Sequence, residues 1–457
     1  MTNLISDHNR FLRGAQVVLG VAAATMMTVG AAFASSPGRM VAQPQAPNAQ
    51  QQKQRPVMRP AAFIPVQLAA GIAEAPMGLT SNGHLPLGSV DDAEGASSFY
   101  AAMKVFDAVE NVADGLGPVY NAQSCRECHQ APMSGGASQM TVLRAGGYVD
   151  GQFVAHAGGS LIQDRAIDPS LQEFVDAHSD DVTAQRLSLS ILGDGFVEAV
   201  PDQTFFDIAA AQPESMRGEV VMVDVLEAPG VQRVGRFGWK SQHASLLSFA
   251  ADAYLNEMGI TSPLFPQENS SDGNSVAAFD SVADPEDEAQ SASPFGIDVH
   301  IFADYSRSLA APPRIISALS RSDVNTGQAL FEQVGCAMCH TSELVTAPAG
   351  TLLNGGTFTV SHALGDKRIH PYSDYLLHDI GIGDGIHQTG SPEARNKMRT
   401  APLWGLSMRN RYMHDGQSYT LEEAIRRHAG QAEQVRRRFE DLSRPERRQM
   451  LLFLRSL

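Results

Sequence analysis

Two short cysteine–histidine motifs, residues 125–129 (CRECH) and 336–340 (CAMCH), contain all four cysteines of the chain. The Cys-x-x-Cys-His pattern is the attachment signature of c-type haem. Two thiols one helical turn apart can each form a thioether with a haem vinyl group, and the following histidine then lies under the ring as the proximal iron ligand. The motifs therefore predict two covalently bound haem c groups. The predicted attachment residues are Cys125, Cys128, Cys336 and Cys339, and the predicted iron ligands are His129 and His340.

Three other kinds of site use paired cysteines. A zinc site could be formed by four cysteines from two Cys-x-x-Cys pairs. Here the pairs are 211 residues apart, and such a site would leave both histidines unused. A thioredoxin-like redox motif requires a βαβ context that the sequence does not indicate, and simple disulfides are compatible with an oxidising compartment. With 14 histidines in 457 residues, a histidine after both pairs would arise by chance about once in a thousand. Haem attachment is the favoured interpretation.

A haem that relays electrons needs a second axial ligand, and a methionine in that position raises its potential. Met398 and Met408 lie 58 and 68 residues after His340, within the usual reach of the sixth ligand in a cytochrome c. We predict these two methionines as ligand candidates, although a methionine more often serves packing. The alternative ligands are His378 and Tyr372.

Two haems in one chain suit a two-electron reaction that is supplied by a one-electron donor, such as the reduction of hydrogen peroxide. That reaction needs a group that moves a proton near one haem. His156 and Glu198 follow the first motif and are candidates, although each alone is more often a structural residue. Trp239 and Trp404 are the only tryptophans. A ring between the haems could carry an electron hole, but packing in the core is the commoner role of a buried tryptophan.

Mainly helical elements are expected to position these residues. A helix from about Gly327 leads into the second motif, and a terminal helix starts at about Pro445. We expect the small face at Gly327 to let the first helix pack closely against the terminal helix. Such a crossing of the first and last helices is expected of a small cytochrome c domain. Ser443 and Glu446 have capping-box spacing. Because no long alternating run is apparent, the predicted fold is mainly α, with two cytochrome c-like haem domains, long irregular loops and few short strands.

The composition restricts the class of protein. A chain of 457 residues with 43% hydrophobic and 18% charged residues is globular and long enough for two or three domains. Acidic residues outnumber basic ones by 50 to 34, and the net charge is -16. This excess argues against a nucleic-acid partner, which needs a basic surface, and disfavours docking on an anionic membrane.

The N-terminus has the pattern of an export signal. Arg10 and Arg13 precede an apolar run, residues 15–32, and a small-x-small cleavage pattern follows at residues 32–34. We expect the mature protein in the periplasm or otherwise exported, whereas an uncleaved segment would anchor it in the membrane. The predicted organisation is a signal peptide (1–34), a disordered Gln/Pro-rich spacer (35–75), an N-terminal haem c domain (76–266), an acidic insert or linker (267–294) and a C-terminal cytochrome c-like haem domain (295–457).

Segments beyond the haem motifs resemble the di-haem oxidoreductase family, which is related to bacterial di-haem cytochrome c peroxidases and is often labelled a peroxidase or thiol oxidoreductase family. The resemblance is carried by residues 115–129, 235–269, 330–344, 372–381 and 399–425. Ile380 stands where this family has a methionine, so one thioether ligand is absent. Since haem uses all four cysteines, no thiol remains for dithiol exchange.

The resemblance implies that the haem on His129 reacts with hydrogen peroxide and that the haem on His340 receives electrons from a small redox protein, a cytochrome or cupredoxin. His414, in the segment that resembles the His-Asp-Gly run of the peroxidases, is expected near the second haem. Calcium binding and a homodimer follow by analogy only. Two alternatives stay open: a non-catalytic di-haem electron-transfer cytochrome, in which both irons are six-coordinate, and a di-haem enzyme that oxidises a protein or an organic substrate.

Overall fold

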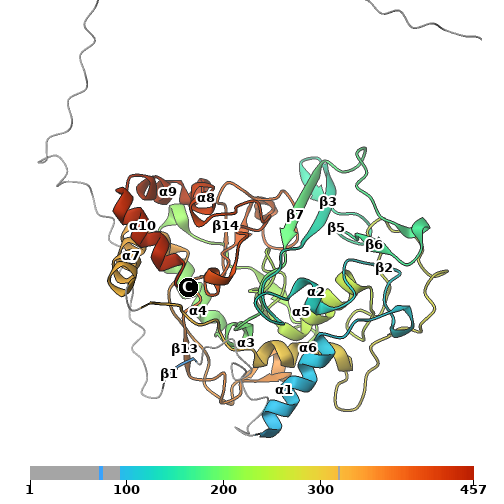
Figure 1. Cartoon of the computed structure of the whole chain (residues 1–457). Coiled ribbons are helices and arrows are strands. Elements are labelled where there is room, and N and C mark those ends of the chain that lie inside the picture. Colours follow the sequence, from blue (N-terminus) through green and yellow to red (C-terminus); the bar gives the residue numbers. More distant parts are fainter. Residues whose placement is uncertain (1–71, 76–92, 318–319) are drawn as a thin grey trace, which may run out of the picture. The chain divides into compact units, whose positions relative to one another are not determined.

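Helices and many short strands follow one another in the computed structural model, which describes residues 72–75, 93–317 and 320–457 (Figure 1). These residues belong to the compact unit Val57–Leu457, the second of two units into which the chain divides. The predicted signal peptide (1–34) lies outside the described residues, as does the predicted spacer apart from residues 72–75. Within the described ranges, no helix combines the length and apolar character needed to span a bilayer.

One group of helices surrounds the first cysteine motif. It consists of α1 (Ala93–Phe106), α2 (Cys125–Cys128), α5 (Leu246–Ala253) and α6 (Ile297–Ser308). Helix α6 packs against α1 and α5, and the ring centroids of Phe106 and Tyr305 are 4.8 Å apart. The Asp287 carboxylate accepts hydrogen bonds from the backbone N–H groups of Ile297 and Val299 (2.8 and 3.0 Å), where the helix dipole favours a negative charge. Asp287, which belongs to the predicted acidic insert (267–294), therefore caps α6.

A second group of helices surrounds the second motif. It consists of α7 (Arg321–Val334), α8 (Leu421–Arg426), α9 (Glu433–Glu440) and α10 (Arg444–Leu454), which lie together in Figure 1. Helix α7 packs across α10, and a Cβ atom on Gly327 would lie only 2.1 Å from the Gln449 carbonyl oxygen. The predicted capping box is confirmed, because the Ser443 side chain accepts the Glu446 N–H and the Glu446 carboxylate accepts the Ser443 N–H.

The prediction of a mainly α fold is wrong. Helices make up 33% of the structure and strands 17%, in many small sheets. In the largest sheet, β3 (Thr141–Val149) pairs antiparallel with β7 (Val182–Leu187) over six residue pairs, and β4 (Gln152–Val154) and β5 (Leu161–Ile162) also pair with β3. The sequence of β3 hides this strand, since two glycines interrupt it and its residues do not alternate cleanly between buried and exposed.

The other strands are two or three residues long, too short to produce a periodic pattern. They join segments that are distant in sequence: β14, which carries His378, pairs with β15, which carries Met398. The pairs are β1 (Ala73–Glu74) with β13 (Lys367–Ile369) and β13 with β10 (Leu344–Val345), β2 (Val119–Tyr120) with β6 (Arg165–Ala166), β8 (Met222–Asp224) with β9 (Gln232–Val234), β11 (Leu352–Leu353) with β12 (Phe358–Thr359), and β14 (Leu377–His378) with β15 (Met398–Arg399).

Buried apolar residues form two main clusters. The larger one includes residues of α1, α5 and α6 together with α3 (Asp194–Glu198) and α4 (Asp202–Ala211), and Phe196 and Phe205 are fully buried in it. The smaller one lies among α7, α9 and α10, where Phe439 and Phe453 are fully buried. Each cluster therefore supports the helices that precede or cover one cysteine motif.

Candidate haem-binding cavities

Each cysteine motif lines a cavity of its own. The first cavity is lined by Cys125, Cys128 and His129, and the second by Cys336, Cys339 and His340. The two cavities are equal in size, each with an empty volume of about 1490 Å³ that includes its opening to solvent. The walls of both cavities are mostly apolar, as a porphyrin requires.

The arrangement of the cysteines disfavours the other kinds of site. The two motifs lie in separate cavities and so do not form one four-cysteine metal site, and all four thiols are free of disulfides. Burial raises the pKa of Cys125 and of Cys128, that of Cys128 to about 12. Zinc binding and dithiol exchange both use the thiolate, and these surroundings oppose it.

The first motif forms a single helical turn. The backbone N–H of His129 donates to the Cys125 carbonyl oxygen (3.0 Å), which places the imidazole directly after the two thiols. Burial lowers the pKa of His129, so the ring is neutral and keeps a lone pair for a metal. Its Nδ1 atom is buried and has no hydrogen-bond partner of normal geometry among the described residues.

The second motif orients its histidine more tightly. The backbone N–H of His340 donates to the Cys336 carbonyl oxygen (3.0 Å), and Nδ1 of the ring lies 3.0 Å from the Tyr372 carbonyl oxygen. A carbonyl oxygen can only accept, so Nδ1 carries the proton and Nε2 is left as the ligand atom. Burial, assisted by the nearby His428, lowers the pKa of His340 to about 4. The ring therefore stays neutral at physiological pH.

Buried cations around the cavities provide an independent test of whether haem fits. Arg144 Nε and Arg186 Nη2 at the first cavity, and Arg409 Nη2 at the second, are buried and have no hydrogen-bond partner among the described residues. An unpaired buried guanidinium nitrogen is costly. Haem carries two propionates, which would supply the missing acceptors. The residues that are present therefore fit the group.

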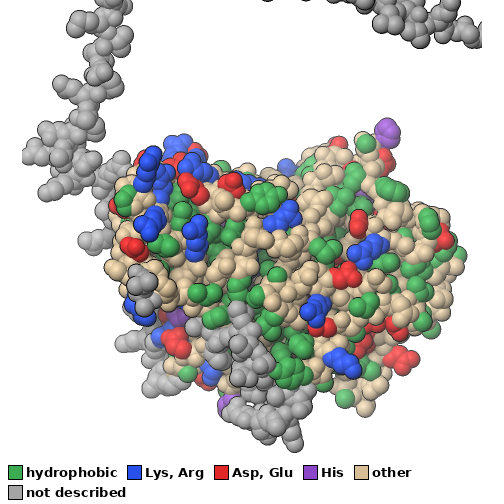
Figure 2. Space-filling view, in the orientation of Figure 1, with side chains coloured by type: hydrophobic (Ala, Val, Ile, Leu, Met, Phe, Trp, Pro, Cys, Tyr) green, Lys and Arg blue, Asp and Glu red, His purple; other side chains and the backbone are tan. Residues whose placement is uncertain are grey.

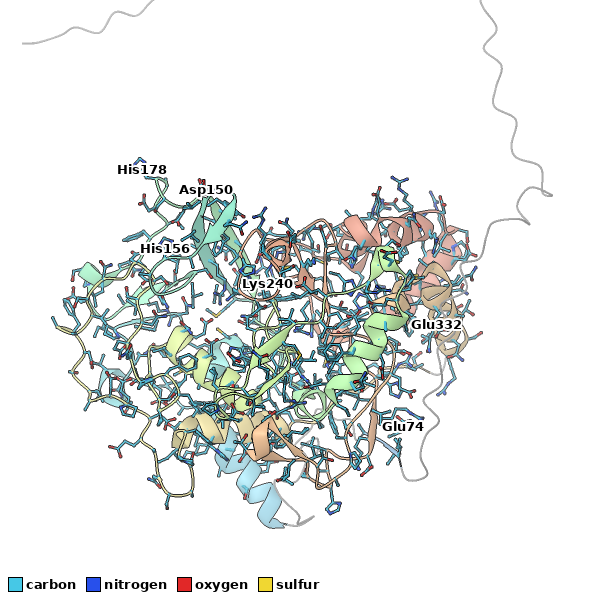
Figure 3. All side chains as sticks on the ribbon, turned by 180° about the vertical axis from the view of Figure 1, so that it is seen from behind. Glu74, Asp150, His156, His178, Lys240 and Glu332 are labelled. Carbon is cyan, nitrogen blue, oxygen red and sulfur yellow. The ribbon has the colours of Figure 1, made fainter. Side chains whose placement is uncertain are left out.

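The two cavities share one wall. It is formed by Leu187, Ser188, Leu189, Trp239, Arg399 and Pro402. The indole Nε1 of Trp239 donates to the Leu187 carbonyl oxygen (2.8 Å), and the ring lies edge-on to His414 with centroids 6.1 Å apart. The next residue, Lys240, is fully buried in the interior (Figure 3), and its ammonium pairs with Asp384 (2.9 Å). This ion pair fixes the backbone beside the shared tryptophan.

A family model described as "Di-haem oxidoreductase, putative peroxidase" matches residues 169–457, well over half of the chain. The chain belongs to this family. The match includes the second motif and the shared wall, and the first motif lies before it. Two haem groups are therefore the cofactors of this di-haem oxidoreductase.

Two solved structures share a distant likeness with this di-haem oxidoreductase. One is the hydrazine synthase of Kuenenia stuttgartiensis, with 14% identity and a TM-score of 0.38, covering 85% of this chain and 97% of that one. Another is a MauG-like protein associated with microbial copper homeostasis, with 15% identity and a TM-score of 0.36, covering 85% and 94%. No curated protein matches the chain.

Three carboxyl groups line the first cavity of this di-haem oxidoreductase, on Asp194, Asp252 and Glu257. Burial raises the pKa of Glu257, and its carboxylate accepts a hydrogen bond from Asn121 Nδ2 (2.7 Å). Burial also raises the pKa of Asp194, to about 7. Burial alone would do the same for Asp252, but its pKa is lowered because His243 lies 3.3 Å away. Glu257 was missed at the sequence level, where a glutamate within a helical run has no distinguishing signal.

The predicted sixth-ligand residues are divided between the second cavity and other parts of the fold. The ligand candidates Met398 and His378 line the second cavity, whereas Met408 and the Tyr372 side chain do not; His414, which was expected near this haem, lines the same cavity. Both ring nitrogens of His378 are already engaged, Nε2 by Asp374 (2.8 Å) and Nδ1 near the Cys339 sulfur (3.7 Å). Tyr372 acts through its backbone, as the acceptor for His340.

The predicted proton-transfer residues lie outside both cavities. His156 pairs with Asp180 (2.7 Å) in the region of Asp150 and the β3–β4 turn (Figure 3). Glu198 is fully buried, and its carboxylate accepts two bonds from Arg307 (2.7 and 3.0 Å). Trp404 likewise lines neither cavity. In the structure, His156 and Glu198 therefore form ion pairs away from the cavities instead of lining a haem site, and Trp404 does not lie between the cavities.

A further histidine, His428, lies in the second cavity and was not predicted. It lies two residues after the end of α8, and its Nδ1 lies 2.8 Å from the Ala424 carbonyl oxygen. The centroid of its ring is 6.5 Å from that of His340. Sequence reasoning looked for methionines in this role, and no local motif distinguishes one histidine among arginines.

Proposed function

We propose that this chain is an exported di-haem c-type oxidoreductase that reduces hydrogen peroxide, with electrons passing from the haem on His340 to the haem on His129. The observation that carries the proposal is the pair of motif-lined cavities that meet at a wall containing Trp239. When bound, the two haem groups supply two one-electron centres. This number matches the reaction, in which one hydrogen peroxide takes up two electrons and two protons and yields two water molecules.

The cysteines and histidines of the motifs would hold the cofactors. One thioether from each cysteine would fix the haem edge, and Nε2 of His129 and of His340 would bind the irons. The proton on His340 Nδ1 is held by the Tyr372 carbonyl oxygen, which sets the ring orientation and strengthens Nε2 as a donor. Covalent attachment suits an exported protein, because the cofactor then cannot be lost to the surroundings.

Glu257 is the proposed proton carrier at the first cavity. Its carboxylate would take a proton from one oxygen of hydrogen peroxide and return it to the other oxygen, which then leaves as water when the O–O bond breaks. Burial raises the pKa of Glu257 above the usual range, which brings it closer to the value that suits proton transfer near neutral pH. Asn121 holds the carboxylate in place (2.7 Å).

Trp239 is the proposed electron path between the cavities. It belongs to the wall that both cavities share, and its N–H is fixed by the Leu187 carbonyl oxygen. This hydrogen bond holds the aromatic ring in one orientation within the wall between the two cavities. Its neighbours Arg399 and Pro402 in the same wall are polar and aliphatic, so the tryptophan provides the π system there.

A small acidic redox protein is the proposed electron donor. Figure 2 shows Lys and Arg side chains gathered over the region of α8–α10, which carries the wall of the second cavity. Nine arginines occur between Arg426 and Arg455, some of them in surface ion pairs such as Arg426 with Glu422 (2.9 Å). A basic surface would steer an acidic donor toward the haem on His340, in a salt-dependent manner.

Electron paramagnetic resonance of the oxidised, haem-loaded protein tests the function. We expect one high-spin ferric signal that disappears when hydrogen peroxide is added, and its selective loss in the Cys125→Ala/Cys128→Ala variant. Two low-spin signals that are indifferent to peroxide, before and after one-electron reduction, would overturn the enzyme and support an electron-transfer cytochrome. Peroxide consumption that requires a protein or organic reductant instead of a reduced cytochrome would support the substrate-oxidising alternative.

A further inference from the structure

Two histidines, His340 and His428, line the second cavity, and their ring centroids are 6.5 Å apart. Two rings lie close to His340 in the described structure, those of Phe331 (6.3 Å between centroids) and His428 (6.5 Å). Of the two, His428 alone carries an atom that can bind a metal. Both histidines line the same cavity.

The separation of the two rings suits a shared metal ion. Two imidazoles that bind one metal from opposite sides, through nitrogen–metal bonds of about 2.0 Å, have ring centroids roughly 6–7 Å apart. The observed 6.5 Å between His340 and His428 falls in this range. Direct packing of the rings would allow a shorter separation, so the gap between them is large enough to admit an iron in a flat macrocycle.

The hydrogen bonds leave the same nitrogen free on both rings. Nδ1 of His340 is held by the Tyr372 carbonyl oxygen (3.0 Å), and Nδ1 of His428 by the Ala424 carbonyl oxygen (2.8 Å). Because each carbonyl oxygen accepts the Nδ1 proton, Nε2 is the lone-pair atom on both rings. This is the arrangement in which protein carbonyls fix metal-binding histidines.

The backbone around His428 is also fixed. Its N–H donates to the Ile425 carbonyl oxygen (3.1 Å), and the N–H of the next residue, Ala429, donates to the Ile380 carbonyl oxygen (2.8 Å). These bonds join the end of α8 to the segment after β14, which also borders the cavity. The imidazole is therefore held in position before any cofactor binds.

We propose that His428 Nε2 is the second axial ligand of the iron bound by His340, which makes the C-terminal haem a bis-histidine centre. The inference rests on the proposed haem loading of both cavities. It replaces Met408, which lines neither cavity, whereas Met398 lines the second cavity and is the competing ligand that the test must separate from His428. A histidine in place of methionine lowers the haem potential, so this centre would be a stronger electron donor to the first haem.

The test compares full-length, haem-loaded variants by near-infrared magnetic circular dichroism, electron paramagnetic resonance and redox titration. The wild type should show a bis-histidine low-spin signature. His428→Ala should convert that haem to high spin, and added imidazole should restore low spin. His428→Met should shift its midpoint potential to higher values. Met398→Leu and Met408→Leu are the matched variants, and both should keep the bis-histidine signature.

A histidine–methionine signature in the wild type, or an unchanged low-spin haem in His428→Ala, would overturn the proposal. Haem content separates this failure from failure of the proposed function. Two covalent haems per chain with a different ligand contradict only the assignment of His428, whereas a chain that carries no haem contradicts both. The imidazole rescue shows that a change in His428→Ala arises at the iron and not from misfolding.

Discussion

Trp239 and Leu187 are joined by a hydrogen bond from the indole N–H to the carbonyl oxygen (2.8 Å), and both residues line both cavities. A buried indole N–H normally finds such a partner, so the bond itself is ordinary. The position of the bond is unusual, because it fixes an aromatic ring in the wall between two cofactor sites. The shared wall thereby combines a rigid strand end, from β7, with a redox-capable side chain.

Replacing Trp239 should slow electron transfer between the haems. Trp239→Phe keeps an aromatic ring but removes the bond to Leu187, which costs about 1 kcal/mol of stability. We expect a several-fold slower re-oxidation of the second haem after peroxide is added, as followed by stopped-flow absorbance. Trp404→Phe is the control, since Trp404 lines neither cavity. Equal rates in the wild type and Trp239→Phe would exclude the ring from the path.

Removing the carboxyl of Glu257 should abolish most peroxide turnover. Glu257→Gln keeps the shape but cannot take up a proton, and general acid–base catalysis contributes about 10²–10⁴-fold. Steady-state turnover with an excess of reduced donor measures this loss. Glu74→Gln is the matched control, because Glu74 lines neither cavity and pairs with Arg368 on the surface (3.0 Å).

The pH profile distinguishes Glu257 from the other carboxyls. Burial raises the pKa of Glu257, and the group must be ionised to accept the peroxide proton. Turnover should therefore fall as the pH drops through this raised pKa, and the acidic limb should vanish in Glu257→Gln. If Asp194→Asn removes that limb instead, the proton carrier is Asp194, whose pKa burial raises to about 7.

The sequence alone predicted the parts of the site in which the chemistry is local. Two thiols and a histidine must be close in sequence to attach one haem, so both motifs were readable and each lines its own cavity. Two of the helices around the second motif, α7 and α10, were readable for a similar reason. The capping box depends on two residues one turn apart, Ser443 and Glu446. The helix crossing depends on a single small residue, Gly327.

The parts of the fold and of the site that were not predicted depend on contacts between distant segments of the chain. The distance from His340 to His428 is 88 residues in sequence, and Glu257 meets Asn121 across 136 residues. No spacing rule connects such residues. The strands were missed because most are two or three residues long, and a period of two cannot be recognised over that length. Tertiary pairing, not local pattern, decides these elements.

The crossing of α7 and α10 should not tolerate a larger residue at its centre. A Cβ on Gly327 would lie 2.1 Å from a backbone oxygen of α10, so Gly327→Ala forces the helices apart. We expect a loss of about 1–3 kcal/mol of stability, seen as a lower Tm in thermal unfolding. Asn325→Ala, at an exposed position of the same helix, should be neutral or slightly stabilising. Equal Tm values for the two variants would contradict the crossing.

The pair of Glu198 and Arg307 should be structural and not catalytic. Burial alone would raise the pKa of Glu198, but the Arg307 guanidinium outweighs it and holds the pKa below the usual 4.5. Glu198→Gln removes the buried counter-ion of Arg307 and leaves it only the exposed Asp304 (3.2 Å), which costs about 3–5 kcal/mol. Glu422→Gln removes an exposed pair with Arg426 (2.9 Å) and should cost less than about 1 kcal/mol.

The stability that Glu198 contributes should depend on pH in a defined direction. Because the folded-state pKa of Glu198 is depressed, its contribution to stability is present above pH 4.5 and is lost as the pH falls through the folded-state value. The Tm deficit of Glu198→Gln should therefore be largest at neutral pH and shrink in acid. Among the molecules that stay folded, the pH profile of peroxide turnover should match the wild type. A missing acidic limb in Glu198→Gln would instead give Glu198 a part in proton transfer, despite its burial away from both cavities.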